Sequence, residues 1–120
     1  MTPPVQIGDA TLYHGDAVEL IANLPPANLV VTDPPYLLTS GGQNAGYMKG
    51  KFGGQYDNSG RLVACDITWP KIMQVVASAL RDGGDAYVMA DDKNITDAAF
   101  AAECADLQHH RHLVWHKTGG

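Results

Sequence analysis

The stretch Val30-Val31-Thr32-Asp33-Pro34-Pro35-Tyr36 decides the fold, because an apolar run ends there in an acid, two prolines and an aromatic residue. The run from Leu29 to Thr32 predicts a short, buried strand of a parallel sheet. Proline lacks the N–H that a strand ladder needs, so the strand ends here. A residue before proline is held extended, which applies to both Asp33 and Pro34. The sequence therefore predicts a stiff segment at the carboxyl end of a strand, where open α/β sheets bind their ligands.

The side chains of this segment suit chemistry on an aromatic amine. Asp33 offers carboxylate oxygens as acceptors, and Pro34 offers a backbone carbonyl. If these two oxygens accept both hydrogens of an exocyclic amine, the nitrogen is drawn toward tetrahedral geometry and its lone pair can attack a methyl group. Acceptors fixed where positive charge develops provide electrostatic preorganisation. Tyr36 offers a flat face on which a base flipped out of a duplex can stack.

These residues resemble the Asp-Pro-Pro-Tyr motif of the amino-methyltransferases that modify adenine or cytosine in DNA. The resemblance implies a Rossmann-like parallel α/β sheet, S-adenosylmethionine as methyl donor and double-stranded DNA as substrate. It implies catalytic roles for Asp33, Pro34, Pro35 and Tyr36. Other blocks are similar to the bacterial and phage adenine-specific enzymes, in the same order: Thr11-Leu12-Tyr13-His14-Gly15-Asp16, Leu24-Pro25, Gly83-Gly84-Asp85-Ala86-Tyr87-Val88 and Val114-Trp115-His116-Lys117.

Two residues are expected to contact the cofactor, namely Asp16 and Asp33. A Gly-Asp pair that matches Gly15-Asp16 contacts the adenine amine of the cofactor in this family, and strand-end carboxylates line the ligand crevice of such sheets. Asp16 also precedes an apolar pattern typical of a helix over 17–24, so it can equally be a helix cap. Both roles are compatible with each other.

The resemblance predicts methyl transfer to N6 of adenine. N4-cytosine methylation is the alternative within the same chemistry, although the cytosine enzymes more often have Ser where this chain has Asp33. The alternative from another class is a truncated, non-catalytic fragment that binds a partner. The formal net charge of −5 favours this last alternative, because DNA phosphates attract lysine and arginine, and the chain has only eight of them.

Composition and length set further bounds. At 120 residues the chain is one domain or less, with 45% hydrophobic residues, enough for a small core. It contains no long apolar run and no signal peptide, so we expect a cytoplasmic protein without membrane contact. The resemblance implies that its source is a bacterium or a phage. Cys65 and Cys104 are far apart in sequence, and reduced thiols are the expectation.

Periodicity predicts alternating strands and helices. Strands are expected over 11–14, 29–32, 85–90 and 112–116, and helices over 17–24, from 66–70 to 80, and from Asn94 or Thr96 to Leu107. Gly83 is expected to end the second helix, and the residues before position 11 have no clear period. This order indicates a parallel α/β sheet with flanking helices.

The segment 37–61 has a different composition, with seven of the thirteen glycines. A loop of this length is usually functional or disordered. As a lid over DNA it would bring Lys49 and Lys51 to phosphates and Tyr56, or Tyr47, to a base. The other interpretation is a flexible insertion.

Three further groups of residues have ordinary explanations. Asp91-Asp92 suit a turn before the last helix, with a role in the target-base pocket as the alternative. The histidines at 109, 110, 112 and 116 lack a nearby carboxylate or Cys, so no metal site is expected. Trp69 and Trp115 are expected in a core or interface.

The expected methyltransferase is incomplete in this sequence. Its Gly-rich cofactor loop would follow a strand and open a helix, and the glycines of 37–61 do not fit that pattern. The target-recognition region is also not visible. We therefore expect residues 1–120 to be the N-terminal, catalytic portion of a longer enzyme, with a sheet edge that could support self-association.

Overall fold

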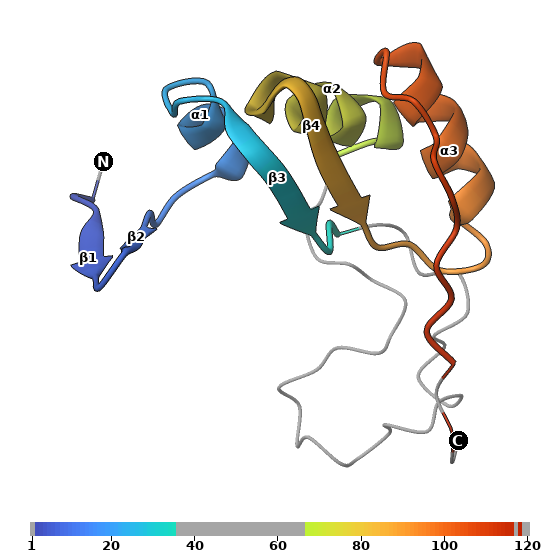
Figure 1. Ribbon diagram of the computed structural model, residues 1–120, viewed down its shortest axis with the longest axis horizontal. Coiled ribbons are helices and arrows are strands. Elements are labelled where there is room, and N and C mark those ends of the chain that lie inside the picture. Colours follow the sequence, from blue (N-terminus) through green and yellow to red (C-terminus); the bar gives the residue numbers. More distant parts are fainter. Residues whose placement is uncertain (1, 36–66, 117, 119–120) are drawn as a thin grey trace.

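The computed structural model describes residues 2–35, 67–116 and 118 of the chain, and the elements below are those of this part. The chain is a mixed α/β structure with two small sheets (Figure 1). Its elements are β1 (Val5–Ile7), β2 (Ala10–Leu12), α1 (Ala17–Ile21), β3 (Ala27–Thr32), α2 (Trp69–Ala79), β4 (Leu80–Val88) and α3 (Ile95–Cys104).

The central feature is a parallel pair formed by β3 and β4. Val30 lies opposite Ala86, Val31 opposite Tyr87 and Thr32 opposite Val88. Helix α2 lies behind this sheet, with α1 and α3 on either side of it (Figure 1). The prediction of a parallel strand that ends at Thr32 is therefore confirmed.

The amino-terminal strands form a separate hairpin, which the sequence analysis did not predict. β1 and β2 pair antiparallel, with Val5 opposite Leu12 and Ile7 opposite Ala10. Gly8 and Asp9 form the turn, and Gly8 adopts a φ of 58°. A Gly-Asp pair between short apolar runs is a hairpin signal, because a two-residue turn needs positive φ. The strand expected over 11–14 is thus in the hairpin and not in the parallel sheet.

Helix α2 and strand β4 join without a loop, which corrects the expected role of Gly83. The helix ends at Ala79, and Gly83, with a φ of 77°, lies inside β4. The register moves from Ala27 opposite Leu80 to Leu29 opposite Asp85, so residues 81–84 bulge out of the ladder. Gly84 allows this bulge because a Cβ there would lie 3.0 Å from the backbone oxygen of Arg81.

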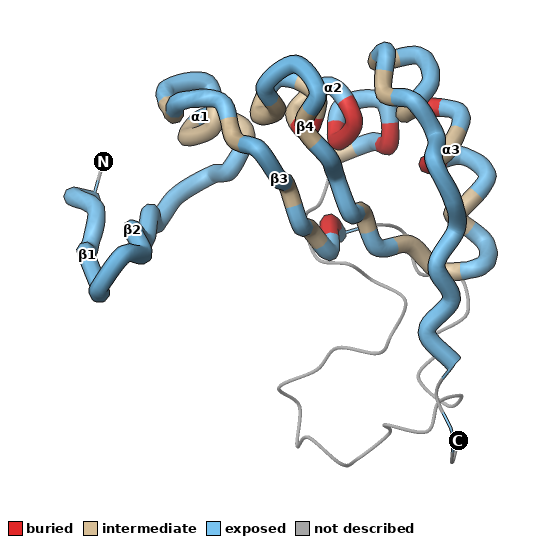
Figure 2. Tube along the Cα trace, viewed as in Figure 1, coloured by how far each residue is buried: buried red, intermediate tan, exposed pale blue. Residues whose placement is uncertain are grey.

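The hydrophobic core lies among the helices on one side of the sheet. Helix α2 begins at Trp69, with Pro70 in its first turn as predicted, and its apolar face buries Ile72 and Val76. The remaining core residues are Trp69, as expected, and Met73 of α2 with Ala98 and Ala101 of α3 (Figure 2). Val30 and Val88 are half-buried against this core, so the sheet faces it with one surface only.

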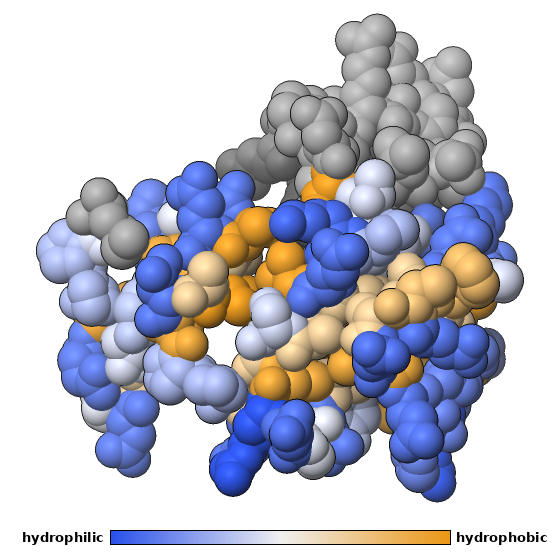
Figure 3. All heavy atoms as spheres, turned by 90° about the horizontal axis from the view of Figure 1, so that it is seen from above, coloured by the Kyte–Doolittle hydropathy of each residue, from blue (hydrophilic) through white to orange (hydrophobic). Residues whose placement is uncertain are grey.

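The opposite surface of the sheet is exposed, which corrects the expectation of a buried strand. Leu29 and Val31 of β3 and Tyr87 of β4 are exposed there. A strand is buried on both faces only when elements cover both, and in the described residues the helices cover one. Seen from above, the molecule also has hydrophobic residues at its surface across the middle, between hydrophilic groups on either side (Figure 3).

The segment after α3 does not form the strand expected over 112–116. Residues 109–116 have no regular secondary structure and are exposed. They run in the same general direction as β4 without pairing to it (Figure 1). Trp115 is exposed and therefore not a core residue. Apolar alternation alone could not produce a strand here, because a strand also needs a neighbouring edge within hydrogen-bond distance.

Candidate functional site

Asp33 lies at the point where β3 ends, with an exposed side chain. The backbone N–H of Met89 donates to the carbonyl of Thr32 at 3.0 Å, which is the last ladder bond before the prolines. After it the chain leaves the sheet, because Pro34 and Pro35 have no N–H to continue the ladder. The carboxylate of Asp33 is therefore held at the carboxyl end of a parallel strand, where open α/β sheets bind ligands.

The two prolines that follow Asp33 differ in burial. Pro34 is buried, whereas its neighbours Asp33 and Pro35 are exposed (Figure 2). A buried ring on one side and a ladder bond on the other restrict the backbone of Asp33, which the following proline already holds extended. The position of the carboxylate is thus set by rigid elements, as a site for orienting a substrate requires. Tyr36 lies outside the described residues.

Alternation places Asp33 on the exposed surface of the sheet. Side chains two residues apart share a face, so Asp33 follows Leu29 and Val31 on that surface. On the neighbouring strand β4, Tyr87 is exposed on the same surface, and alternation adds Met89, an exposed residue that directly follows β4. Sequence analysis did not single out these two residues. The signal was the alternation of Asp85, Tyr87 and Met89 with the smaller residues between them, which places all three on one face.

The carboxylate of Asp91 is used within the fold. It accepts hydrogen bonds from the backbone N–H of Asn94 at 2.9 Å and from the Asn94 Nδ2 at 2.7 Å. Asn94 Oδ1 in turn accepts a hydrogen bond from Trp69 Nε1 at 3.0 Å. These bonds join the start of α3 to the start of α2, close to the end of β4. The predicted turn at Asp91 is confirmed, and Asn94 is the N-cap residue of α3 as expected, although its side chain makes no cap bond.

Asp16 is the N-cap of α1, which is one of the two roles expected for it. Its Oδ1 accepts a hydrogen bond from the backbone N–H of Val18 at 2.8 Å. The strand before it, β2, pairs only with β1 in the described part of the chain. Asp16 therefore does not follow a strand of the β3–β4 sheet, which corrects the expected context for cofactor binding. The structure does not bring Asp16 and Asp33 to one strand end.

The residues expected to contact DNA, Lys49, Lys51 and Tyr56, lie outside the described residues. So does the whole segment 37–61, for which the two interpretations stand as before. Within the described part, lysine and arginine are scattered at positions 71, 81, 93 and 111. Arg81 donates a hydrogen bond to Asn28 Oδ1 at 2.5 Å, across the bulge of β4. The described surface therefore has no basic stripe of the kind that follows a DNA backbone.

A pocket of about 390 Å³ lies between the first turns of α2 and α3. Trp69, Asn94 and Asp97 are among the residues that line it. Asp33 does not line this pocket, so the pocket and the strand-end site are separate features.

Two histidines on the last segment, His109 and His112, contact each other edge to face with ring centroids 4.5 Å apart. Among the residues the structure describes, no three His, Cys, Asp or Glu side chains gather as a metal site would need.

Comparison with protein-family models, curated proteins and solved structures found no match. Among the helices of the described residues, none has the length and apolar character that crossing a bilayer requires.

Proposed function

We propose that this chain contributes the amine-binding face of a DNA amino-methyltransferase with a Rossmann-like sheet. The single observation that supports the proposal most is the setting of Asp33-Pro34-Pro35. The acid is exposed at the carboxyl end of a parallel strand, and the next residue is buried. A carboxylate that only terminated a strand would not need a backbone restricted by a ladder bond on one side and a buried proline on the other.

Asp33 and the carbonyl of Pro34 would act as acceptors for the two hydrogens of the adenine N6 amine. As both hydrogens are accepted, the lone pair is withdrawn from the ring and becomes available to attack an electrophilic methyl carbon. With a sulfonium donor bound, the new nitrogen–carbon bond would form as the carbon–sulfur bond breaks and a neutral thioether is left, and the methylated amine would release one proton to water. The fixed positions of the acceptors lower the barrier, because they require no reorganisation as charge develops. N4 of cytosine offers the same amine chemistry, and Asp at position 33 favours adenine.

The methyl donor implied by the resemblance is S-adenosylmethionine, which supplies an activated methyl group when bound. The described residues fit only the amine side of the reaction. The turn between α2 and β4 contains Gly83 and Gly84, but it leads from a helix into a strand. A nucleotide cradle has the opposite order, because phosphates and ribose bind where a strand leads into a helix. In this proposal Asp33 would contact the donor as well as the amine.

The test is transfer of a labelled methyl group from S-adenosylmethionine to duplex DNA by the 120-residue chain. The matched pair of variants is Asp33→Asn and Asp92→Asn, since both acids are exposed and follow neighbouring parallel strands. We expect Asp33→Asn to lose about a hundredfold or more in rate, the scale for one preorganised polar group. Asp92→Asn should keep the wild-type rate, and both variants should keep the wild-type circular dichroism.

Equal rates for the two variants would remove Asp33 from the mechanism. The products distinguish the bases, because N6-methyladenine and N4-methylcytosine separate by chromatography after digestion. If the wild-type chain transfers no methyl group, catalysis by this chain is overturned and the second candidate function stands.

That second candidate is a non-catalytic chain that binds a partner. The exposed apolar surface of the β3–β4 sheet favours it, since monomeric proteins rarely leave contiguous apolar surface uncovered. Calorimetric titration with S-adenosylmethionine separates the two candidates. Tight binding by the chain would support the enzyme, and no heat at millimolar ligand would support the partner-binding function.

A further inference from the structure

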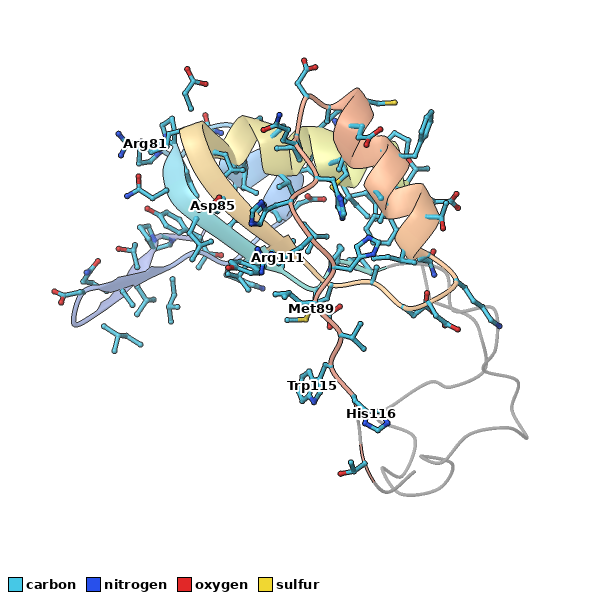
Figure 4. All side chains as sticks on the ribbon, turned by 45° about the vertical axis from the view of Figure 1, so that its right-hand side comes forward. Arg81, Asp85, Met89, Arg111, Trp115 and His116 are labelled. Carbon is cyan, nitrogen blue, oxygen red and sulfur yellow. The ribbon has the colours of Figure 1, made fainter. Side chains whose placement is uncertain are left out.

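The carboxyl end of the β3–β4 sheet closes with a single hydrogen bond next to Asp33. The backbone N–H of Met89 donates to the carbonyl of Thr32 at 3.0 Å. Met89 lies just beyond the end of β4, where the chain turns toward the start of α3 (Figure 4). Asp33 directly follows Thr32, so whatever holds Met89 in place also holds the backbone that carries the Asp33 carboxylate.

This bond needs support from the segments that follow the two strands. A pair of strands has little stability of its own, and the ends of an element open before its middle. Pro34 and Pro35 donate no further ladder bond beyond Thr32. After β3 the support is the burial of Pro34. After β4 it is the turn over residues 89–94.

Asp91 holds that turn together through its side chain and its backbone. Its Oδ1 accepts hydrogen bonds from the backbone N–H of Asn94 at 2.9 Å and from Asn94 Nδ2 at 2.7 Å. Its backbone carbonyl accepts from the N–H groups of Asn94 and Ile95, at 3.2 and 3.0 Å. One residue thus fixes the path of the chain from β4 into α3.

Asn94 connects the turn to the hydrophobic core. Its Oδ1 accepts a hydrogen bond from Trp69 Nε1 at 3.0 Å. Trp69 is only 9% exposed and is the first residue of α2, so its indole is fixed by packing. The set Trp69, Asn94 and Asp91 is called the turn anchor below. It joins the core to a turn that begins two residues before Asp91, at Met89.

We propose that Asp91 is a positioning residue of the candidate site, and that the turn anchor holds Asp33 through the bond between Met89 and Thr32. The inference rests on the proposed methyl transfer, because it assigns to the anchor the orientation of the acceptor for the amine. Asp91 is half-buried and its Oδ1 is used by Asn94, so its role is indirect. A small displacement of an orienting group is costly in rate, which is why such groups are fixed by a supporting network.

Hydrogen exchange at the Met89 amide of the 120-residue chain measures the positioning independently of activity. Asp91→Ala removes the side-chain acceptor, and we expect the Met89 amide to exchange about tenfold faster, the scale of one net hydrogen bond. Asp91→Asn keeps a side-chain oxygen, so it should restore most of the protection. Asp92→Ala changes the exposed acid next in the turn and should leave the exchange rate unchanged.

A second control separates a local effect from a general loss of stability. Val76→Ala leaves a cavity in the core and removes no atom of the turn anchor. It should speed exchange at the amides in the middle of α2 and leave Met89 at the wild-type rate, since a strand end opens without unfolding the core. In Asp91→Ala the order should be reversed, with the largest change at Met89.

The rate of methyl transfer measures the consequence for the site. We expect Asp91→Ala to lower kcat about tenfold while KM for duplex DNA stays within about twofold, because orientation acts on the chemical step more than on binding. Asp91→Asn should recover most of kcat. Val76→Ala should keep the wild-type kcat at a temperature where it is fully folded.

The two proposals can fail separately. Wild-type exchange at Met89 in Asp91→Ala overturns the positioning role, and so does faster exchange with an unchanged kcat. If the wild-type chain transfers no methyl group, the proposed function fails. Faster exchange at Met89 in Asp91→Ala would then still support the turn anchor as the structure that fixes Asp33.

Discussion

Val31 of β3 lies opposite Tyr87 of β4 in the parallel register, and both side chains are exposed. One position earlier on each strand, Val30 lies opposite Ala86, and Val30 packs on the core. The sheet therefore has two unlike faces made from one continuous apolar run. Asp33, two residues after Val31, belongs to the exposed face by alternation. The candidate site thus lies on the exposed face of the sheet.

The difference between the two faces can be measured with one substitution at two adjacent positions. Val30→Thr puts a hydroxyl against the core, and we expect it to lower the free energy of unfolding by about 1 to 2 kcal/mol. Val31→Thr keeps a β-branched side chain in water, and we expect a change within about 0.5 kcal/mol. Urea unfolding followed by circular dichroism, at a concentration where the chain is monomeric, gives both values. Equal losses at the two positions would contradict the one-sided burial.

Gly83 is expected to be essential to the bulge of β4. Its φ of 77° is left-handed, while a Cβ at this position would meet no atom within 4 Å. The cost of Gly83→Ala is then conformational, about 1 to 2 kcal/mol of unfolding free energy. Gly83→Asn should cost less, because asparagine tolerates this conformation better than alanine. Thermal or urea unfolding of the two variants tests the order, and a larger loss for asparagine would contradict it.

Asp16 has a structural role that can be separated from a role in cofactor binding. Asp16→Ala removes the acceptor for the Val18 N–H, and such N-cap losses cost about 1 kcal/mol. Asp16→Asn keeps a side-chain oxygen and ranks equally as a cap, so stability should be nearly unchanged. Hydrogen exchange at the amides of α1 reports the cap locally. If Asp16 also binds the cofactor amine, Asp16→Asn should weaken S-adenosylmethionine binding in calorimetry while exchange stays at the wild-type rate.

The hydrogen bonds from Asn94 to Asp91 should be coupled in their effect on stability. Asp91→Ala breaks both bonds, whereas Asn94→Ala removes the bond from Nδ2 and the acceptor of Trp69 Nε1 but keeps the backbone N–H donor. Each variant is expected to cost about 1 to 3 kcal/mol. The double variant should cost clearly less than the two single losses together, because residues in one network do not act independently. Asp92→Ala is the control, since Asp92 is exposed beside the same turn. Additive losses in urea unfolding would show that the network is not cooperative.

Local chemistry was sufficient to predict much of this fold. Two prolines after Thr32 end the strand whatever surrounds it, and Asp16 and Pro70 mark helix starts through their own bonding capacity. The apolar spacing of Ile72 and Val76 predicts the buried face of α2. The exposure of Asp33 at a strand end follows from the same local rules. These inferences succeed because each cause and its effect lie within a few residues.

The tertiary structure decided what depends on distant neighbours. The run from Leu29 to Thr32 is compatible with burial on both faces, but in the described residues helices pack against only one of them. Leu113 to Trp115 has the composition of a strand, and it has no ladder partner in the part of the chain that the structure describes. Asp16 follows a strand that pairs in a separate hairpin. Sequence specifies the capacity of a segment to pair or to be buried, whereas pairing and burial themselves require a second segment at a fixed distance.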